Sequence, residues 1–364
     1  MSDVLRVGVV GCGLIGQAVH LPNLAGLPER FAIAALADPS PTVGDAVAAR
    51  YGLTSAHRSW EALLDAEAGL DALVVCSPHA THAAVILAAL ERGLHVFVEK
   101  PLCITVADAE AIARAATGAG KVVQVGYMKR YSPGYDAFLA ALPSSAEGLR
   151  AVDVLTYDPW MARAPFVPWG RMVQGADIPA VVLARARAEE ARQVGEAVGA
   201  EDPKSVRSFS YTFLACLVHD VNLIHGALDH LGIAAEPLRS AAWADGDAAT
   251  ATLRLPGGAE WRMTWLLLRG LMDFEERARL FFSDAIHELT FSVPYHVDVP
   301  IAHAMTTGVA GVHRRTVDLT VHDPFLAELE HFHACVTAGL TTRTPPEQSV
   351  ADLRVLRDLY LRRS

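Results

Sequence analysis

Three glycines near the start of the chain constrain its fold more than any other feature of the sequence. Gly11, Gly13 and Gly16 follow the apolar run Leu5–Val10 and open a helical pattern that ends near Leu27. In a strand–turn–helix unit, the first glycine allows a tight turn, the second lets backbone N–H groups approach an anion, and the third allows close packing of helix on strand. The helix N-terminus adds a favourable partial charge for phosphate. The pattern therefore predicts a Rossmann domain that binds the pyrophosphate of a dinucleotide, through Gly11, Gly13, Leu14, Ile15 and Gly16.

Short apolar runs alternate with helical patterns throughout the first 127 residues, as in a parallel sheet covered on both faces. The predicted strands are Leu5–Val10, Phe31–Ala37, Leu70–Cys76, His95–Glu99 and Val122–Gly126. The predicted helices are Gly16–Leu27, Pro41–Tyr51, Trp60–Asp65, His79–Arg92 and Thr105–Thr117. We therefore expect a doubly wound α/β domain over residues 1–127.

After residue 127 the pattern changes to strands at hairpin spacing with few helices, which predicts an α+β domain over residues 128–364 with a large open, mostly antiparallel sheet. The strands are predicted at Leu149–Tyr157, Val206–Phe213, Leu238–Trp243, Thr250–Leu255, Glu260–Leu268, Phe274–Phe282 and Ile286–Val293. The helices are predicted at Ala180–Val198, Leu217–Leu231, Pro324–Ala338 and Gln348–Leu361, the last two as candidates to pack back on the first domain. The polar helix Ala180–Val198 reads as an insertion, either a solvated surface helix or a flap over a site.

The composition excludes several classes of protein. A formal net charge of −10 argues against a nucleic-acid surface, which needs clustered Lys and Arg. No run of 18 apolar residues occurs, so no membrane-spanning segment is expected. The five cysteines never show a Cys-x-x-Cys spacing, which argues against a disulfide framework and a zinc site and favours a reducing cytoplasm. No bound metal is predicted.

An acidic residue stands where the adenosine ribose of a dinucleotide is bound. Asp38 ends the second predicted strand, about 22 residues after Gly16. Its carboxylate would accept hydrogen bonds from the ribose hydroxyls and repel a 2′-phosphate, and the next residues, Pro39–Thr42, contain no arginine. We therefore expect NAD, with NADP as the alternative.

Polar residues follow the third and fourth predicted strands, at the sheet edge where open α/β folds bind ligands. The segment after the third strand supplies Cys76, Ser77, Pro78, His79 and His82, and the fourth strand supplies Glu99 and Lys100. We predict that these residues and Gln124 contact the cofactor. The three-residue spacing of His79 and His82 would permit a metal pair, but a place in the nicotinamide pocket or at the helix start fits better. The Lys100–Pro101 bond is a candidate cis peptide.

The glycine turn, the segment Val-Val-Cys-Ser-Pro-His-Ala-Thr-His, Glu99–Lys100–Pro101 and Gly126–Tyr131 together resemble the glucose–fructose oxidoreductase and inositol dehydrogenase (Gfo/Idh/MocA) family, most clearly over residues 5–135. The resemblance implies NAD(P)-linked hydride transfer at a hydroxyl or carbonyl carbon of a sugar, cyclitol or amino sugar. It implies that Lys100 is catalytic and that Met128 and Lys129 lie near the substrate. It also implies that the open sheet supports a homodimer or homotetramer.

One motif of that family is incomplete here. The pattern Asp-x-x-x-His-x-x-Asp reads Ala215, His219 and Asn222 in this chain, so only the histidine is retained. A spacing of four places the first two positions on one helix face, so the carboxylate that would orient the histidine is missing. Asp220 points about 100° away and is not a simple substitute. His219 is the predicted general acid or base and contacts the substrate, unless it is only a structural histidine.

We expect a NAD(P)-dependent dehydrogenase or reductase acting on a small sugar-like or cyclitol-like molecule, with Lys100 and His219 handling the proton. Three alternatives stay open. Loss of the carboxylate at Ala215 is compatible with a non-catalytic NAD-binding regulator. It is also compatible with an imine reductase, or with a transient-redox enzyme that keeps its NAD bound.

Overall fold

The computed structural model describes residues 4–159, 167–291, 293, 295, 300–309 and 312–363. The chain forms two compact units. The first contains Met1–Tyr127 and two later segments, Pro168–Glu201 and Phe325–Val350. The remaining segments, Met128–Val167, Asp202–Pro324 and Ala351–Ser364, form the second unit. The chain therefore leaves the first unit after Tyr127 and returns to it twice.

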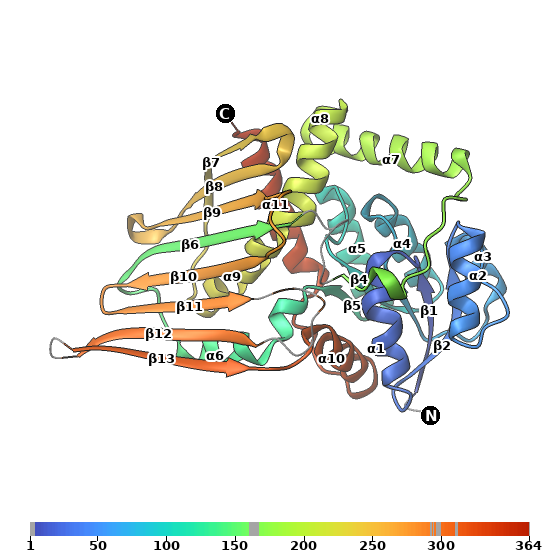
Figure 1. The fold of residues 1–364 in the computed structure, drawn as a ribbon, viewed down its shortest axis with the longest axis horizontal. Coiled ribbons are helices and arrows are strands. Elements are labelled where there is room, and N and C mark those ends of the chain that lie inside the picture. The colour runs from blue at the N-terminus through green and yellow to red at the C-terminus, as the bar shows by residue number, and fades with distance from the viewer. Residues whose placement is uncertain are drawn as a thin grey trace. The chain divides into compact units, whose positions relative to one another are not determined.

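The first unit is built on a five-stranded parallel sheet with the strand order β2-β1-β3-β4-β5 (Figure 1). Its strands are β1 (Leu5–Val10), β2 (Phe31–Ala37), β3 (Ala72–Val75), β4 (His95–Glu99) and β5 (Val123–Gly126). Its early helices are η1 (Gly16–His20), α1 (Leu21–Gly26), α2 (Pro41–Arg50), α3 (Trp60–Ala66), η2 (His79–Thr81), α4 (His82–Glu91) and α5 (Val106–Ala119). All four residues of β3 are buried, as expected for a strand covered on both faces. The predicted doubly wound α/β fold is confirmed.

The two returning segments add helices to the first unit. Helix α7 (Ala180–Val198) is the predicted polar insertion, and it packs on η2. Helix α10 (Pro324–Ala338) contributes Leu329 and Phe332 to the hydrophobic core that contains Leu36 and Phe97. These aromatic and aliphatic side chains are fully buried, which fixes α10 to this core.

The second unit is built on an eight-stranded sheet with the order β13-β12-β11-β10-β6-β9-β8-β7 (Figure 1). All neighbouring strands run antiparallel except β6 and β9, which are parallel. The strands are β6 (Leu149–Asp158), β7 (Glu236–Trp243), β8 (Ala248–Arg254), β9 (Glu260–Leu267), β10 (Glu275–Phe282), β11 (Ala285–Phe291), β12 (Ile301–Val309) and β13 (Val312–Thr320). The predicted α+β fold with a large, mostly antiparallel sheet is confirmed.

Helices cover one face of this sheet. Helix α6 (Pro133–Ala141) packs on β11, β12 and β13. Helix α9 (Val218–His230) faces the middle of the sheet, where the His225 ring contacts Trp261 of β9. Helix α11 (Pro346–Leu361) contributes Tyr360, whose ring contacts Phe209 and Phe213. No helix among the described residues is long and apolar enough to cross a membrane.

The predicted strand Val206–Phe213 is wrong, because this segment is helical. Helix α8 (Pro203–Val206), the π-helical segment η6 (Arg207–Leu217) and α9 follow one another without a break. The Asp202 carboxylate accepts hydrogen bonds from the N–H groups of Lys204 and Ser205, which caps the start of the helix. The alternation of polar and aromatic residues imitates a strand, but Phe209 and Phe213 stand four apart on one helix face against Tyr360.

The sequence patterns also did not predict β12, β13 or α6. Helix α6 nevertheless has clear local signals, because Ser132 caps it through the Gly134 N–H and Pro133 is its first residue. The last predicted strand also ends earlier than expected, at Phe291.

Candidate active site

The glycine turn has the geometry that a bound pyrophosphate requires. Gly11 has a φ of 98°, and a Cβ there would lie 2.7 Å from the Cys76 carbonyl oxygen. A Cβ on Gly16 would lie 2.5 Å from the Gly11 carbonyl oxygen, so no side chain fits between turn and helix. Gly13 is exposed, and a Cβ there would meet nothing within 4 Å. Gly11 and Gly16 therefore make the close approaches that the pattern predicts, Gly13 borders open space, and the residues present fit a dinucleotide.

Asp38 lies at the end of β2 beside this turn, and it is 8% exposed. Its carboxylate accepts hydrogen bonds from the Cys12 N–H at 2.8 Å and the Ser40 N–H at 2.9 Å. These bonds fix the carboxylate next to the glycine turn. Each oxygen keeps a further lone pair for a ribose hydroxyl.

A segment distant in sequence docks onto the same loops within the first unit. The Gln17 side chain makes two hydrogen bonds with the backbone of Val173, at 3.0 and 2.8 Å. The Asp177 carboxylate accepts hydrogen bonds from the Ser40 hydroxyl and from the Thr42 N–H. The residues between Val173 and Asp177 therefore run from the glycine turn to the start of α2.

Helix α7 extends this docking to the loop after β3. The buried Gln193 side chain donates a hydrogen bond to the Ala80 carbonyl at 2.7 Å, and the His79 imidazole lies 3.5 Å from the Glu190 carboxylate. The insertion thus contacts three loops at the carboxyl edge of the parallel sheet. Its role as a flap stays a hypothesis.

The loop after β3 is held together by its own polar groups. Ser77 and Thr81 share a hydrogen bond of 2.7 Å between their hydroxyls. The buried His82 imidazole lies 2.7 Å from the Ser77 carbonyl and 2.9 Å from the Pro101 carbonyl. Burial lowers the pKa of His82 to about 4, so the neutral ring donates to one carbonyl at a time. His82 therefore links the loops after β3 and β4 rather than facing solvent.

Lys100 follows β4 at the same edge and is half-buried. The Lys100–Pro101 peptide is cis, as expected from the sequence. The preceding Glu99 carboxylate accepts a hydrogen bond from the Lys100 N–H at 3.2 Å and lies 2.6 Å from Nε2 of the buried His20. Glu99, held by His20, therefore fixes the position of the backbone at Lys100.

Glu328 lies beside this pair, and one ligand atom from each of His20, Glu99 and Glu328 lies within 4.8 Å of the others. One imidazole and two carboxylates have the chemistry to hold a divalent cation. No cation was predicted, and the hydrogen bond between His20 and Glu99 already accounts for two of the three groups. The absence of a metal stays a prediction.

Gln124 on β5 lies apart from the exposed residues of the edge. It is fully buried, and its amide donates to the Glu328 carbonyl at 2.7 Å and accepts from the Thr342 hydroxyl at 3.3 Å. Both ends of the amide thus connect β5 to the returning segment. Its predicted contact with the cofactor stays a prediction.

In the second unit, the Lys129 side chain is buried, and its predicted contact with the substrate stays a prediction. It is 7% exposed and forms an ion pair with the buried Glu276, while the neighbouring Met128 is half-buried. Asp220 is 1% exposed and accepts a hydrogen bond of 3.1 Å from the Thr156 hydroxyl. Burial raises the pKa of Asp220 well above its usual range, and the charge of Glu276 raises it further. Asp220, which directly follows His219, is therefore a buried carboxyl in addition to Glu276.

His219 lies in the first turn of α9 and is half-buried. Ala215 lies one turn earlier in η6, so no carboxylate stands at that position. Asn222 donates to Asp352 of α11 at 2.8 Å, and the His225 imidazole lies 2.5 Å from the same carboxylate. The position of the family's trailing Asp is thus tied to α11 through Asp352. Lys100 and His219 belong to different units, and their meeting at one substrate is a proposal.

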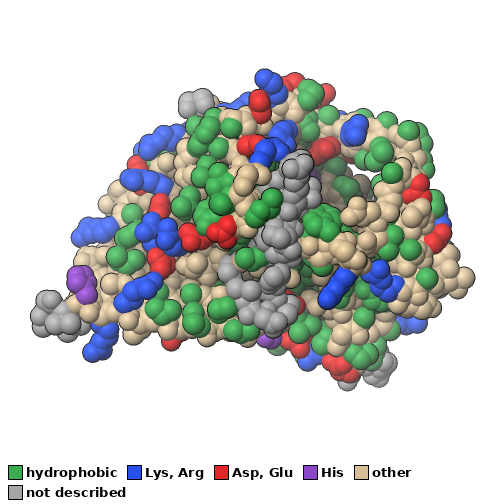
Figure 2. Space-filling model, viewed as in Figure 1, with side chains coloured by type: hydrophobic (Ala, Val, Ile, Leu, Met, Phe, Trp, Pro, Cys, Tyr) green, Lys and Arg blue, Asp and Glu red, His purple; other side chains and the backbone are tan. Residues whose placement is uncertain are grey.

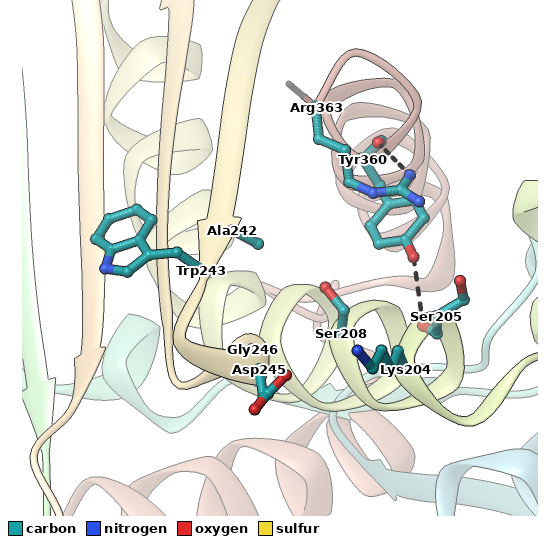
Figure 3. Close-up of a pocket in the computed structure, with 9 residues that line it drawn as sticks. All are labelled: Lys204, Ser205, Ser208, Ala242, Trp243, Asp245, Gly246, Tyr360 and Arg363. Carbon is teal, nitrogen blue, oxygen red and sulfur yellow. Dashed lines mark hydrogen bonds between the residues drawn. The ribbon is translucent and has the colours of Figure 1, made fainter.

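A cavity of about 650 Å³ lies elsewhere in the second unit (Figure 3). Lys204, Ser208, Trp243, Tyr360 and Arg363 are among its lining residues, and the Arg363 guanidinium donates to the Tyr360 carbonyl at 2.9 Å. None of the sequence-predicted site residues lines it. Sequence reasoning also did not single out Gln17, Asp177 or Glu276 for the sites described above.

A parallel sheet with a glycine turn after its first strand and an acidic residue after its second has the features of a dinucleotide-binding Rossmann domain. Residues 5–127 match the family model described as the oxidoreductase family with a NAD-binding Rossmann fold. Those residues therefore match the Gfo/Idh/MocA family model, and the resemblance noted in the sequence is confirmed over them.

Curated relatives match the same part of the chain. Inositol 2-dehydrogenase 1 of Saccharopolyspora erythraea is 39% identical over 145 residues, which cover 40% of this chain and 43% of that protein. The NAD⁺-dependent scyllo-inositol 2-dehydrogenase of Bacillus subtilis is 31% identical over 136 residues, which cover 37% and 39%. The chain thus matches less than half the length of these relatives.

Solved structures match nearly the whole chain at the level of the fold. UDP-N-acetylglucosamine 3-dehydrogenase from Acidithiobacillus ferrooxidans aligns with a TM-score of 0.70 at 20% identity, covering 98% of this chain and 97% of that one. A 3-ketoreductase from Actinomadura kijaniata, in complex with NADP and TDP-benzene, aligns with a TM-score of 0.73 at 19% identity, covering 99% and 98%. At this identity the likeness supports the fold alone.

Proposed function

We propose that the protein is a NAD(P)-dependent oxidoreductase that transfers hydride to or from a hydroxyl or carbonyl carbon of a sugar-like or cyclitol-like molecule. The observation that carries the proposal is the placement of Lys100 at the same carboxyl edge of the sheet as the Gly11–Gly16 turn. A dinucleotide held at that turn lies along this edge in open α/β folds. The curated relatives in the matched region are named as inositol dehydrogenases.

The nicotinamide ring, when bound, supplies the hydride chemistry. Glycine-turn N–H groups would hold the pyrophosphate, and Asp38 would accept hydrogen bonds from the adenosine ribose. The loop residues Ser77 and His79 would lie along the nicotinamide half. Glu99, fixed by His20, would hold the backbone that presents Lys100.

The proton is handled by two side chains in this proposal. The Lys100 ammonium donates a hydrogen bond to the reacting oxygen, which lowers the free energy of a developing alkoxide. His219 accepts the substrate's hydroxyl proton during oxidation and returns it during reduction, because an imidazole titrates near neutral pH. Without a carboxylate at Ala215, the imidazole is oriented by other groups, which distinguishes this site from the family pattern.

The test is to incubate the protein with NAD⁺ and a panel of substrates, and to follow the absorbance band of NADH. The panel contains myo-inositol, scyllo-inositol, a UDP-N-acetylhexosamine and simple hexoses, each also tried with NADP⁺. Time-dependent reduced nucleotide with at least one panel member is the expected result. Tight binding of NAD⁺ without turnover of any member would instead favour the non-catalytic regulator.

A second candidate is a transient-redox enzyme that keeps its NAD bound. The docking of the insertion at Gln17, Ser40 and Ala80 favours it, since the same segment contacts loops at both ends of the dinucleotide site. This candidate predicts NAD in the purified protein and no net NADH during turnover. Mass spectrometry of the denatured protein's supernatant distinguishes it from a dehydrogenase with an exchanging cofactor.

A further inference from the structure

The insertion brings a carboxylate to the adenosine half of the dinucleotide site. Asp177 Oδ2 accepts the Thr42 N–H at 2.8 Å, and Oδ1 is hydrogen-bonded by the Ser40 hydroxyl. The Ser40 oxygen also accepts the Val43 N–H at 3.1 Å. Asp177 and Ser40 therefore cap the start of α2 together, although Asp177 lies 137 residues away from Ser40 in the sequence.

Ser40 connects this carboxylate to the ribose-binding residue. Its N–H donates to Asp38 at 2.9 Å while its hydroxyl bonds to Asp177. Two carboxylates thus flank one serine, directly after β2. In Rossmann folds the 2′-position of the adenosine ribose lies against the residues that follow this strand.

A 2′-phosphate needs positive partners at this place, such as an arginine or free N–H groups at a helix start. The Thr42 N–H is already bonded to Asp177. The Arg58 guanidinium lies beside Gly44 of α2, and it is bonded to Asp45 at 2.6 Å. The site therefore offers a phosphate dianion two negative charges and no uncommitted cation among these residues.

The segment that carries Asp177 is tightly seated. A Cβ on Gly175 would lie 2.8 Å from the Ser40 hydroxyl oxygen and 2.9 Å from Asp177 Oδ1, so only glycine fits there without displacement. The two bonds between Gln17 and Val173 hold the other end of the segment. Hydrogen bonds from Ser40 and Thr42 lower the pKa of Asp177 to about 2, so its charge is present at every working pH.

We propose that Asp177 is a specificity-determining residue that excludes the 2′-phosphate of NADP and so selects NAD. The inference rests on the proposed function, because it assumes that a dinucleotide binds at the glycine turn. It adds a second carboxylate, supplied by the insertion, to the one that the sequence shows at Asp38.

The experiment measures the Kd of NAD⁺ and of NADP⁺ by calorimetry for the wild type, Asp177→Asn and Asp65→Asn. Asparagine keeps hydrogen-bonding groups at position 177 and removes the charge. Asp65 is an exposed carboxylate of the same unit, paired with Arg92 at 2.8 Å, and serves as the matched control. We expect Asp177→Asn to improve NADP⁺ affinity relative to NAD⁺ about fivefold, since one nearby charge in a high-dielectric site is worth about 1 kcal/mol. The gain should shrink with added salt, and Asp65→Asn should change neither Kd.

An unchanged ratio of the two Kd values in Asp177→Asn would overturn the proposal, as would equal binding of both nucleotides by the wild type. If Asp177→Asn fails to fold, the proposal is tested on the wild type, by measuring how added salt changes the competition of NADP⁺ against bound NAD⁺. Added salt then improves NADP⁺ relative to NAD⁺, and the opposite trend contradicts the role of Asp177. Failure of both nucleotides to bind would overturn the proposed function and this inference together.

Discussion

At the scale of single residues, the second unit holds more buried negative charge than its cation balances. Asp220 and Glu276 are both 1% exposed, and Lys129 is the cation that faces them. Among the described residues, Asp220 Oδ2 and Glu276 Oε1 have no hydrogen-bond partner. A proton on Asp220 makes the cluster electrically neutral and turns an acceptor into a donor, which removes most of the desolvation cost.

This protonation predicts how stability depends on pH. Because burial raises the pKa of Asp220, the folded state keeps a proton that the unfolded chain releases near pH 4. Stability from this group is complete below that pH and falls as the pH rises towards the raised pKa, by up to about 1.4 kcal/mol per pH unit. Asparagine has no proton to lose in this range. The unfolding free energy of Asp220→Asn should therefore increase relative to that of the wild type as the pH rises.

Urea unfolding of both proteins at a series of pH values measures this effect. Asp153→Asn is the control, because Asp153 lies on β6, the strand of the Asp220 partner Thr156, but is part-exposed and paired with Arg279 at 2.7 Å. A difference between Asp220→Asn and the wild type that stays constant from acid to neutral pH would show that Asp220 is ionised.

Some residue roles were predictable from the sequence, and others depend on partners that are distant in the chain. The roles of Gly11 and Gly16 follow from local steric rules, and the structure has the close approaches that those rules require. Asp177 gave no such sign, because its partners Ser40 and Thr42 are distant in the sequence. The ion pair of Lys129 with Glu276 also gave no local sign, because Glu276 lies on strand β10, far along the chain.

At the scale of elements, a buried hydrogen bond from Gln193 connects helix α7 of the insertion to the loop after β3. Gln193 is 4% exposed and donates to the Ala80 carbonyl at 2.7 Å. Arg192, one position earlier, is exposed and forms ion pairs with Glu189 and Glu196 of its own helix. Substitution of Gln193 therefore tests how α7 is held on the loop after β3, and substitution of Arg192 tests the stability of the helix itself.

We expect Gln193→Ala to loosen α7 from the first unit. Leaving a buried carbonyl without its donor costs about 1–3 kcal/mol. Hydrogen exchange over Ala180–Val198 should accelerate accordingly, while Arg192→Ala should change it little because exposed pairs contribute about 0–1 kcal/mol. Equal exchange rates in both variants would mean that Gln193 does not hold the insertion.

Elements with strong local patterns were predictable, and elements defined by distant partners were not. The five parallel strands were found because their apolar runs are buried on both faces. The segment Arg207–Leu217 was misread as a strand, since its alternation outweighed the capping signal at Asp202. Strand β13 pairs with β12, and β12 pairs with β11. The polar, small residues of β12 and β13 show no clear apolar alternation.

At the scale of the whole molecule, α6 and α9 lie behind the large sheet of the second unit in the view of Figure 1. Figure 2 shows hydrophobic side chains among charged ones on the face of this unit toward the viewer. Across this face, Val317 pairs with Ala304, and Leu319 pairs with Ala302. Val317 is 46% exposed and Leu319 is 63% exposed. Such apolar side chains on an open sheet are suited to a partner surface.

We propose that a second copy of the chain covers this face, as the family resemblance implies. Sedimentation equilibrium should then report a dimer or tetramer for the wild type. Leu319→Glu should shift it towards the monomer, because burying an unpaired carboxylate is costly. The control is Leu340→Glu, at an exposed position (52%) of the first unit. A monomeric wild type at micromolar concentration would contradict the proposal.

We propose that Lys100 is the residue that makes the dinucleotide site catalytic. Replacement by alanine removes the ammonium that donates to the reacting oxygen, while the Glu99 carboxylate can still accept the backbone N–H of residue 100. The decisive measurement compares kcat and the Kd for NAD⁺ of Lys100→Ala with those of the wild type, using the best substrate of the panel. The account predicts a loss in kcat of about 100-fold or more, with a nearly unchanged Kd. A kcat that survives within about threefold would contradict it.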